Sequence, residues 1–192
     1  DRVLKILASK DALYNADGNP QLIANNMVLG QAIPFSGDYG ISKNPESFAS
    51  ESYRVYFADK VRGKVMRLSK DGLTAISDHG MKDWFRDNLK LSTKIIGSHD
   101  DRNDEYNITL DSTVAQSSVG ETVSFKEDVR GWVSFKSFTP ENAISCANEY
   151  YTFNNGTLWK HHVKKTTYGG IENNRNTFYK EYGAENEGFT PS

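Results

Sequence analysis

The sequence predicts a mainly β protein: antiparallel meander units forming β-propeller-like blades, with an extended N-terminal arm and one short inserted helix. Three observations lead to this fold class. Ten Tyr, ten Phe and three Trp are a heavy aromatic load for a chain of 192 residues, and aromatic side chains favour pleated, half-buried strands. From residue 53 apolar residues recur with a period of two, and a hairpin-like string is repeated farther along the chain.

Residues 1–52 form the predicted extended arm. This segment has little periodicity and is rich in turn formers, with strong chain-reversal signals at residues 17–20 and 43–45. We expect a short apolar segment at residues 3–8, followed by extended chain with little helix. Because such a segment buries too little surface to offset its conformational entropy, we expect its order to come from neighbouring chains.

The first repeated unit is YRVYFADKVRGKVMRLSKDG, residues 53–72. Its alternating apolar residues predict a strand, a turn at residues 59–63 and a returning strand at 64–69. The Ser-Lys-Asp-Gly reversal then predicts a third strand at 73–77. The string TVSFKEDVRGWVSFKSF, residues 122–138, repeats the Val-Arg-Gly turn, which indicates successive meander units of one kind.

The period of two ends before residues 80–90, which lie in the string HGMKDWFRDNLK. Met81, Trp84, Phe85 and Leu89 recur at helical spacing, so this segment is predicted to be one short amphipathic helix. We expect it to be an insertion that packs on the edge of a sheet.

The remaining predicted strands come in pairs joined by polar turns. They are residues 91–97, 105–110, 122–126, 131–138, 150–153 and 157–161. A closed propeller needs at least about four four-stranded blades, and the strands here amount to roughly two, so we expect part of the ring to lie elsewhere. The predicted β-rich region is therefore 53–165, and 166–192 is a loop-rich tail with a possible strand at 176–182.

Composition limits the function classes. Lys and Arg number 23 against 25 Asp and Glu, so neither a polyanion nor an acidic membrane is an implied partner. No apolar run reaches the roughly 20 residues of a membrane helix, and no signal segment opens the chain. The chain begins with Asp, so we expect a processed product or a piece of a longer polypeptide. Cys146 has no activating neighbour and is predicted to be a buried structural thiol.

Histidines and acidic residues offer few candidates for a metal site. Residues 99–105, HDDRNDE, could hold Ca²⁺, but they lack the spacing of a calcium loop, so a solvated β-turn is the preferred interpretation. His161 and His162 are neighbours on a predicted strand and should point to opposite faces. His79 and His99 lack a local His or Cys partner, and a zinc site assembled from distant segments is the minor alternative.

Other chemistry-bearing residues also have plain structural interpretations. Trp84, Trp132 and Trp159 could form a carbohydrate platform, but on strands and a helix they are more often core. Arg62 and Arg130 could contact a nucleic acid backbone, although pairing with a nearby carboxylate is the plainer account. No nucleophile elbow or phosphate-binding glycine loop is present. The sequence thus predicts no catalytic residue, no cofactor-binding residue, no metal site and no enzymatic activity.

Long strings carry a more specific signal than any short motif. They are DALYNADGNPQLIANNMVLGQAIPFSGDYGISKNPESFA, YRVYFADKVRGKVMRLSKDGLTAISDHGMKDWFRDNL and GWVSFKSFTPENAISCANEYYTFNNGTLWKHH. Together they resemble virion structural proteins of tailed bacteriophages, found in crAss-like and marine phages, that are similar to the β-propeller nozzle or muzzle proteins of short tails. The resemblance covers most of residues 10–165.

The resemblance implies a structural component of the virion tail, made in the host cytoplasm and belonging to a longer polypeptide. The subunit would form a homo-oligomeric ring around the genome exit channel, with other tail or portal-adaptor proteins as partners and genomic DNA in transient passage. It implies no enzyme, so no catalytic residue carries over. Two other functions stay open: a receptor- or glycan-binding tail module, and a cell-wall depolymerase, which would need a carboxylate pair in a groove.

Overall fold

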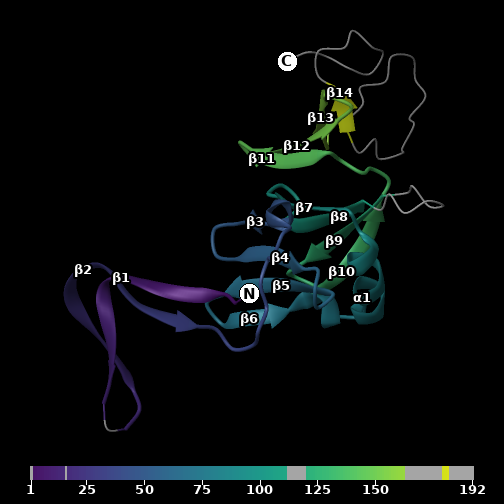
Figure 1. The fold of residues 1–192 in the computed structure, drawn as a ribbon. Coiled ribbons are helices and arrows are strands. Elements are labelled where there is room, and N and C mark those ends of the chain that lie inside the picture. The colour runs from purple at the N-terminus through teal and green to yellow at the C-terminus, as the bar shows by residue number, and fades with distance from the viewer. Residues whose placement is uncertain (1, 16, 112–119, 163–178, 182–192) are drawn as a thin grey trace, which may run out of the picture. The chain divides into compact units, whose positions relative to one another are not determined.

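The computed structural model of the protein describes residues 2–15, 17–111, 120–162 and 179–181. The chain divides into two compact units, Asp1–Gly40 and Ile41–Ser192 (Figure 1). The described residues form antiparallel sheets and a single α-helix, which confirms the mainly β fold class with one short helix.

The first unit is a long β-hairpin. Strands β1 (Leu4–Tyr14) and β2 (Pro20–Pro34) pair antiparallel as a two-stranded sheet. The chain reversal predicted at residues 17–20 lies in its turn, where the Gly18 N–H donates to the Asn15 carbonyl at 2.9 Å. The register shifts beside Ala8, so that β2 bulges outward between its two regularly paired stretches. Residues 4–34 of the predicted arm are thus extended as a paired hairpin, whereas residues 41–52 belong to the second unit.

The described residues of the second unit form three four-stranded sheets, each an antiparallel meander in chain order (Figure 1). The first sheet is β3 (Ala49–Ser50), β4 (Val55–Asp59), β5 (Lys64–Ser69) and β6 (Gly72–Ala75). The second is β7 (Lys94–Asp100), β8 (Glu105–Asp111), β9 (Glu121–Lys126) and β10 (Gly131–Lys136). The third is β11 (Asn142–Cys146), β12 (Glu149–Asn154), β13 (Thr157–His161) and β14 (Tyr179–Glu181).

The sequence predicts most strands of the hairpins, but it does not predict how these strands group into sheets. Strands β3 and β11 escape the sequence analysis: β3 has only two residues, and β11 lies next to turn formers that mask its alternation. The strands that the sequence analysis counted as roughly two blades form three four-stranded meanders when β3 and β11 are included. The strand predicted at 73–77 ends at Ala75, because the 3₁₀ helix η2 (Ile76–Asp78) begins there.

The predicted helix is α1 (Lys82–Leu91). Asp83 in its first turn and Lys90 in its last turn match the helix dipole. The apolar face enters the protein core, where Phe85 and Leu89 are fully buried. The helix contacts β5, an inner strand of the first sheet. Its Trp84 and Phe85 rings also pack on Phe135 and Trp132 of β10, an edge strand of the second sheet, so the expected packing on a sheet edge is confirmed for the second sheet.

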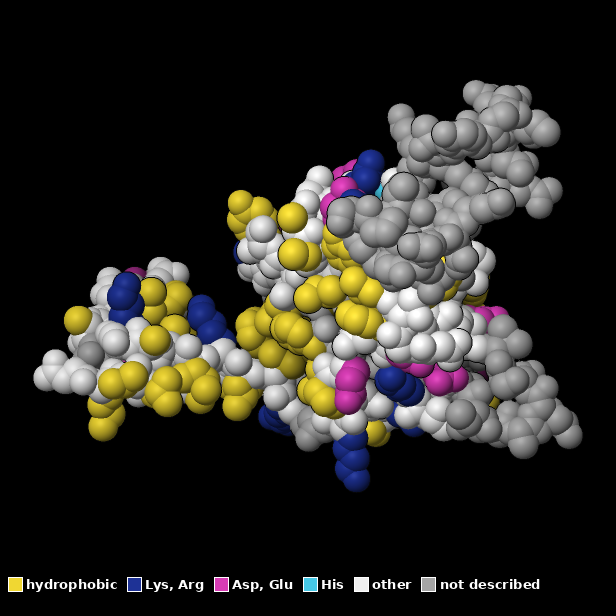
Figure 2. Space-filling model, turned by 90° about the horizontal axis from the view of Figure 1, so that it is seen from above, with side chains coloured by type: hydrophobic (Ala, Val, Ile, Leu, Met, Phe, Trp, Pro, Cys, Tyr) yellow, Lys and Arg dark blue, Asp and Glu magenta, His cyan; other side chains and the backbone are white. Residues whose placement is uncertain are grey.

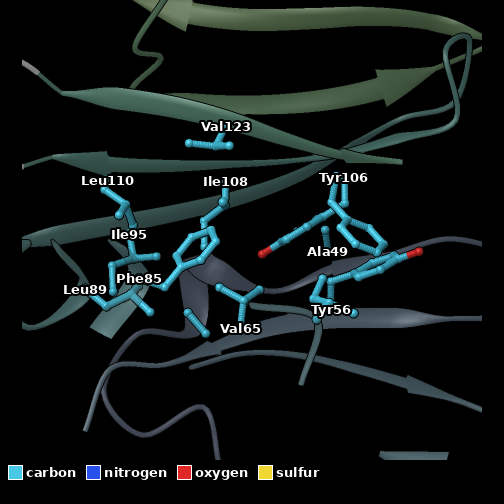
Figure 3. Packing of buried hydrophobic residues seen from close by; sticks show 13 residues of the cluster. Ala49, Tyr56, Val65, Phe85, Leu89, Ile95, Tyr106, Ile108, Leu110 and Val123 are labelled. Carbon is cyan, nitrogen blue, oxygen red and sulfur yellow. The ribbon is translucent and has the colours of Figure 1, made fainter. Parts of the chain in front are cut away.

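The hydrophobic core lies between the first and second sheets and is closed by α1 (Figure 3). Phe85 points at Ile108 and Val65, which come from the two different sheets. Tyr56 and Tyr106 stack with their ring centroids 4.6 Å apart. The core also contains Ala49, Ala58, Ile76, Leu89, Ile95, Leu110, Val123 and Phe125.

The tryptophans belong to this packing. Trp84 and Trp132 are partly buried against the core, and the Trp132 indole N–H donates to the Ile76 carbonyl at 3.1 Å. Trp159 is partly buried on β13. The preferred interpretation of Trp84 and Trp132 as core residues is therefore confirmed. Cys146, by contrast, is exposed at the end of β11, where alternate residues face outward, so the prediction of a buried thiol is wrong.

The two Val-Arg-Gly turns are not structurally equivalent. The turn between β4 and β5 spans residues 60–63, whereas the turn between β9 and β10 spans 127–130. Gly63 occupies the left-handed last position of the first turn with φ of 63°, and Arg130 occupies the same position of the second with φ of 50°. The repeated string is thus shifted by one residue relative to its turn, although both copies connect neighbouring strands of a meander.

Candidate functional site

Polar side chains from all three sheets converge around the turn between β7 and β8, which corresponds to the acidic cluster at residues 99–105. Asp100 orders this turn, because its Oδ1 accepts the main-chain N–H groups of Arg102 at 3.1 Å and Asn103 at 3.4 Å. This is the Asx-type geometry that the sequence predicts. Asp100 and Glu105 are nevertheless buried, so the turn is only partly solvated.

The acidic side chains of this turn face different partners rather than one calcium centre. Asp100 Oδ2 lies 2.6 Å from His162 Nε2, and Lys136 donates to Glu105 at 2.9 Å. Asp101 and Asp104 both turn toward His99. The carboxylates therefore connect this turn to separate elements of the second unit.

The pair of Asp100 and His162 joins the second sheet to the end of the third. Burial opposes ionisation of the Asp100 carboxyl, but the hydrogen bond with His162 and those from the main chain of Asn103 and Arg102 outweigh it, so its pKa lies below the usual value. A group whose pKa is depressed on folding stabilises the protein above its unfolded-state pKa. That contribution is lost as the pH falls through the folded-state pKa.

Asp100→Asn should therefore destabilise the protein at neutral pH by about 1–3 kcal/mol, because a buried charge-assisted pair and an Asx turn are weakened together. The difference in unfolding free energy between the two proteins should shrink as the pH falls below about 4, the ordinary pKa of Asp. Urea unfolding at pH 7 and pH 3 measures this. A difference that stays constant between these pH values would contradict the role given to the ionised carboxylate.

His99, near the end of β7, is buried, with 8% of its surface exposed. Its Nδ1 lies 3.0 Å from Asp101 Oδ1, and its Nε2 lies 3.4 Å from Asp104 Oδ1. Its ring stacks parallel to Tyr56 at 6.1 Å. Glu51, in the segment after β3, completes the group: one ligand atom from each of Glu51, His99 and Asp104 lies within 4.8 Å of the others. Sequence spacing could not reveal Glu51, which is far from the turn along the chain.

A network of charged residues adjoins this group. Glu127, in the turn between β9 and β10, accepts the Tyr56 hydroxyl at 2.8 Å and Arg67 Nη1 at 2.7 Å. Arg54 lies between two carboxylates, pairing with Glu51 and, at 3.7 Å, with Glu127. Burial, together with the hydrogen bond to the Glu127 carboxylate, raises the pKa of Tyr56 well above its usual value. The network thus joins the first sheet to the second.

The other predicted candidates have structural partners. His161 is buried, and its Nε2 lies 2.9 Å from Thr152 Oγ1, while His162 turns to Asp100 as already described. The two neighbours have different partners, but His162 lies beyond the end of β13 with a φ of 59°, and the two ring centroids are 6.0 Å apart. The expectation that they point to opposite faces of one strand is therefore wrong, because the left-handed backbone at His162 ends the alternation of the strand. His79 Nδ1 lies 2.8 Å from the Arg130 carbonyl.

The turn arginine of the first repeat pairs locally. Arg62 Nη1 lies 3.1 Å from Asp59 Oδ2, and the Arg62 main-chain N–H donates to the same carboxylate at 3.0 Å. Pairing with a nearby carboxylate is the interpretation preferred from the sequence, and for Arg62 it is confirmed.

The hairpin of the first unit carries a different kind of feature, a set of exposed apolar side chains (Figure 2). Nine of its large apolar residues are each between 43% and 79% exposed: Leu4, Ile6, Leu13, Tyr14, Leu22, Ile23, Met27, Val28 and Leu29. Val28, the most exposed of them, lies where β2 bulges away from β1. We call these nine residues the hairpin apolar surface.

No helix in the part of the chain that the structure describes has the length and apolar character needed to cross a membrane.

Comparison with known proteins identifies the family of the chain. No curated protein matches the sequence. A family model described as Crassvirus muzzle protein matches residues 8–156, well over half of the 192 residues. The chain therefore belongs to the Crassvirus muzzle protein family and is a structural protein of the crAss-like phage virion.

Proposed function

We propose that the chain is a subunit of a homo-oligomeric ring in the virion tail, which lines the channel through which the genome leaves and has no enzymatic activity. The hairpin apolar surface is the observation that carries this proposal. A two-stranded hairpin is at best marginally stable in water, and large contiguous apolar patches on soluble proteins generally serve as binding surfaces. The hairpin needs a neighbour to cover it.

The proposed occupant of the hairpin apolar surface is a second copy of this chain. Rings of identical subunits form by head-to-tail contacts, in which one surface of each subunit meets a different surface of the next. An arm that covers an adjacent copy makes such a contact without needing a core of its own. We accordingly propose the first unit, Asp1–Gly40, as the arm, because residues 41–52 supply η1 and β3 to the second unit. The region 53–165 as the β-rich part and 166–192 as a tail complete the proposed organisation.

The three meanders support a propeller-like arrangement of the second unit. The first strand of each meander contacts the first strand of the next, since β7 contacts both β3 and β11. In propellers the corresponding strands of successive four-stranded blades lie next to each other around the central axis. We propose that the three sheets are successive blades. Closure at about four blades or more would need strands from another part of the polypeptide or from a neighbouring subunit.

The proposed partners are other copies of the chain and the tail or portal-adaptor proteins next to the ring. Genomic DNA would pass through only transiently. The balance of 23 basic against 25 acidic residues agrees with a channel that does not hold a polyanion tightly. Packing of Trp84 and Trp132 against the core leaves the glycan-binding alternative without a tryptophan platform from these two residues.

Substitution on the hairpin tests the proposal. In the chain of residues 1–192, Leu22→Glu with Val28→Glu should convert oligomers into monomers, because two charges would enter the apolar contact. Light scattering coupled to size exclusion, with electron microscopy of the oligomeric fraction, measures the change. Val61→Glu with Val129→Glu is the matched control, since these turn valines are 67% and 61% exposed in the second unit. A wild-type chain that stays monomeric at high concentration, or equal effects of both variants, would contradict the proposal.

A further inference from the structure

We propose that Glu51, His99 and Asp104 form a binding site for a divalent transition metal ion, for which Zn²⁺ is the best match. The three side chains come from the segment after β3, from β7 and from the turn that follows β7. Their ligand atoms lie within 4.8 Å of one another, and His99 Nε2 is 3.4 Å from Asp104 Oδ1. The site departs from the sequence-based expectation of no metal, because its first ligand is distant in sequence from the other two.

The donor set determines which metal the site would take. One imidazole nitrogen and two carboxylate oxygens suit borderline ions such as Zn²⁺, which binds these groups at about 2.0–2.2 Å and completes a tetrahedron with water. Ca²⁺ prefers six to eight oxygen ligands, so the site should discriminate against it. Side-chain rotation can bring the three atoms to bonding distance, since half of the Asp104 side chain is exposed.

The environment of His99 is the second, independent observation. Asp101 Oδ1 lies 3.0 Å from Nδ1, where it can accept a hydrogen bond from that nitrogen and orient the ring. Nε2 of this buried ring faces the Asp104 carboxylate at 3.4 Å, so the nitrogen and the carboxylate are directed at the same point. A carboxylate on the distal nitrogen is also the usual outer partner of a metal-binding histidine.

The charges around the site are compatible with a cation. Arg54 pairs with Oε1 of Glu51, which leaves the second oxygen of that carboxylate for a metal ion. Arg54 is also shared with Glu127 through Nε, so its charge is partly neutralised from the other side. The Tyr56 ring lies parallel to the His99 ring with their centroids 6.1 Å apart, so an aromatic side chain borders this ligand.

A metal ion here would connect two sheets. Glu51 follows a strand of the first sheet, whereas His99 and Asp104 belong to the second. Because binding to the folded chain alone stabilises it, the ion would raise the melting temperature. The site would thus act as a structural clamp between the two sheets.

The experiment uses the chain of residues 1–192 after removal of metals with a chelator. Isothermal titration with Zn²⁺ should show one site per chain in the wild type. Thermal unfolding should show a rise in Tm of about 5 to 10 °C at a zinc concentration a hundred times Kd. Ca²⁺ at the same concentration should give no such shift.

Asp104→Asn is the decisive variant, because Asn tolerates the left-handed φ of 52° at this position and the turn should stay folded. It should keep the Tm of the metal-free wild type and weaken zinc binding at least tenfold. Asp101→Asn should weaken binding by about 10- to 100-fold through the orientation of His99. Asp71→Asn, an exposed carboxylate in the turn between β5 and β6, is the matched control and should bind as the wild type does.

Three results would overturn the proposal. One is a wild-type chain that gives no calorimetric signal and no Tm shift with Zn²⁺. Another is Asp104→Asn binding zinc as tightly as the wild type, which would place the ion elsewhere. The third is an NMR signature of His99 that does not change when zinc is added, since a metal ion bound at Nε2 must alter the resonances of this ring.

Discussion

Gly97→Ala should destabilise the protein by about 3 kcal/mol, the upper range for an overpacked core. A Cβ at this position of β7 would lie 2.0 Å from the Ser47 carbonyl oxygen and 2.6 Å from its carbon. Ser47 belongs to the 3₁₀ helix η1 (Pro45–Ser47), which contacts β7 directly. Urea unfolding of the two proteins, followed by tryptophan fluorescence, measures the change.

The segment that meets Gly97 has little freedom to move away. The Ser47 carbonyl accepts a hydrogen bond from the Tyr106 hydroxyl at 3.1 Å, and Ser47 Oγ accepts one from the Ala58 N–H at 3.0 Å. Relief of the clash would therefore break hydrogen bonds of fully buried groups, which adds to the cost.

Gly131→Ala is the matched control for this substitution. Gly131 is the first residue of β10 in the second sheet and, like Gly97, has no positive φ. A Cβ at Gly131 would have its nearest neighbour at 3.6 Å. Its effect should stay within about 0.5 kcal/mol, as for an ordinary surface substitution. If both replacements cost the same, strand conformation and not the approach of η1 would explain the requirement for glycine at position 97.

The contrast between local and distant contacts explains what the sequence could predict. The strands of the hairpins and helix α1 follow from periods of two and of 3.6, which are properties of neighbouring residues. The grouping into three meanders depends on β3 and β11. β3 has two residues, and its pairing with β4 is visible only in three dimensions. A strand of two residues is too short to show the alternation of apolar and polar side chains that identifies strands in a sequence.

The candidate site shows the same limit. The acidic turn at residues 99–105 stands out in the sequence, and its Asx geometry follows from Asp100. The sequence does not reveal the partners of its side chains, because Glu51, Lys136 and His162 approach the turn from other sheets or from segments distant in sequence. The resemblance to phage virion proteins was predictable because it rests on strings of more than thirty residues, and the match over residues 8–156 confirms it.

Glu127→Ala should have the second large effect, a loss of about 3 kcal/mol, which is the range for breaking a buried ion pair by removing one partner. The Glu127 carboxylate is 9% exposed and accepts hydrogen bonds from Tyr56 and Arg67 of the first sheet. Its removal would leave the Arg67 and Arg54 guanidinium groups near each other without their shared anion. Unfolding by urea at pH 7 measures the loss.

Two further variants decide whether the charge network causes this loss. Asp128→Ala removes the exposed neighbouring carboxylate in the same turn and should change stability by less than about 0.5 kcal/mol. Arg67→Met combined with Glu127→Ala should recover part of the stability lost in Glu127→Ala, because the double variant no longer buries an unpaired cation. If the losses measured for Arg67→Met alone and for Glu127→Ala alone simply add in the double variant, Glu127 acts through the backbone of its turn. Recovery in the double variant would instead show that the first and second sheets are held together by opposite charges shared across their boundary.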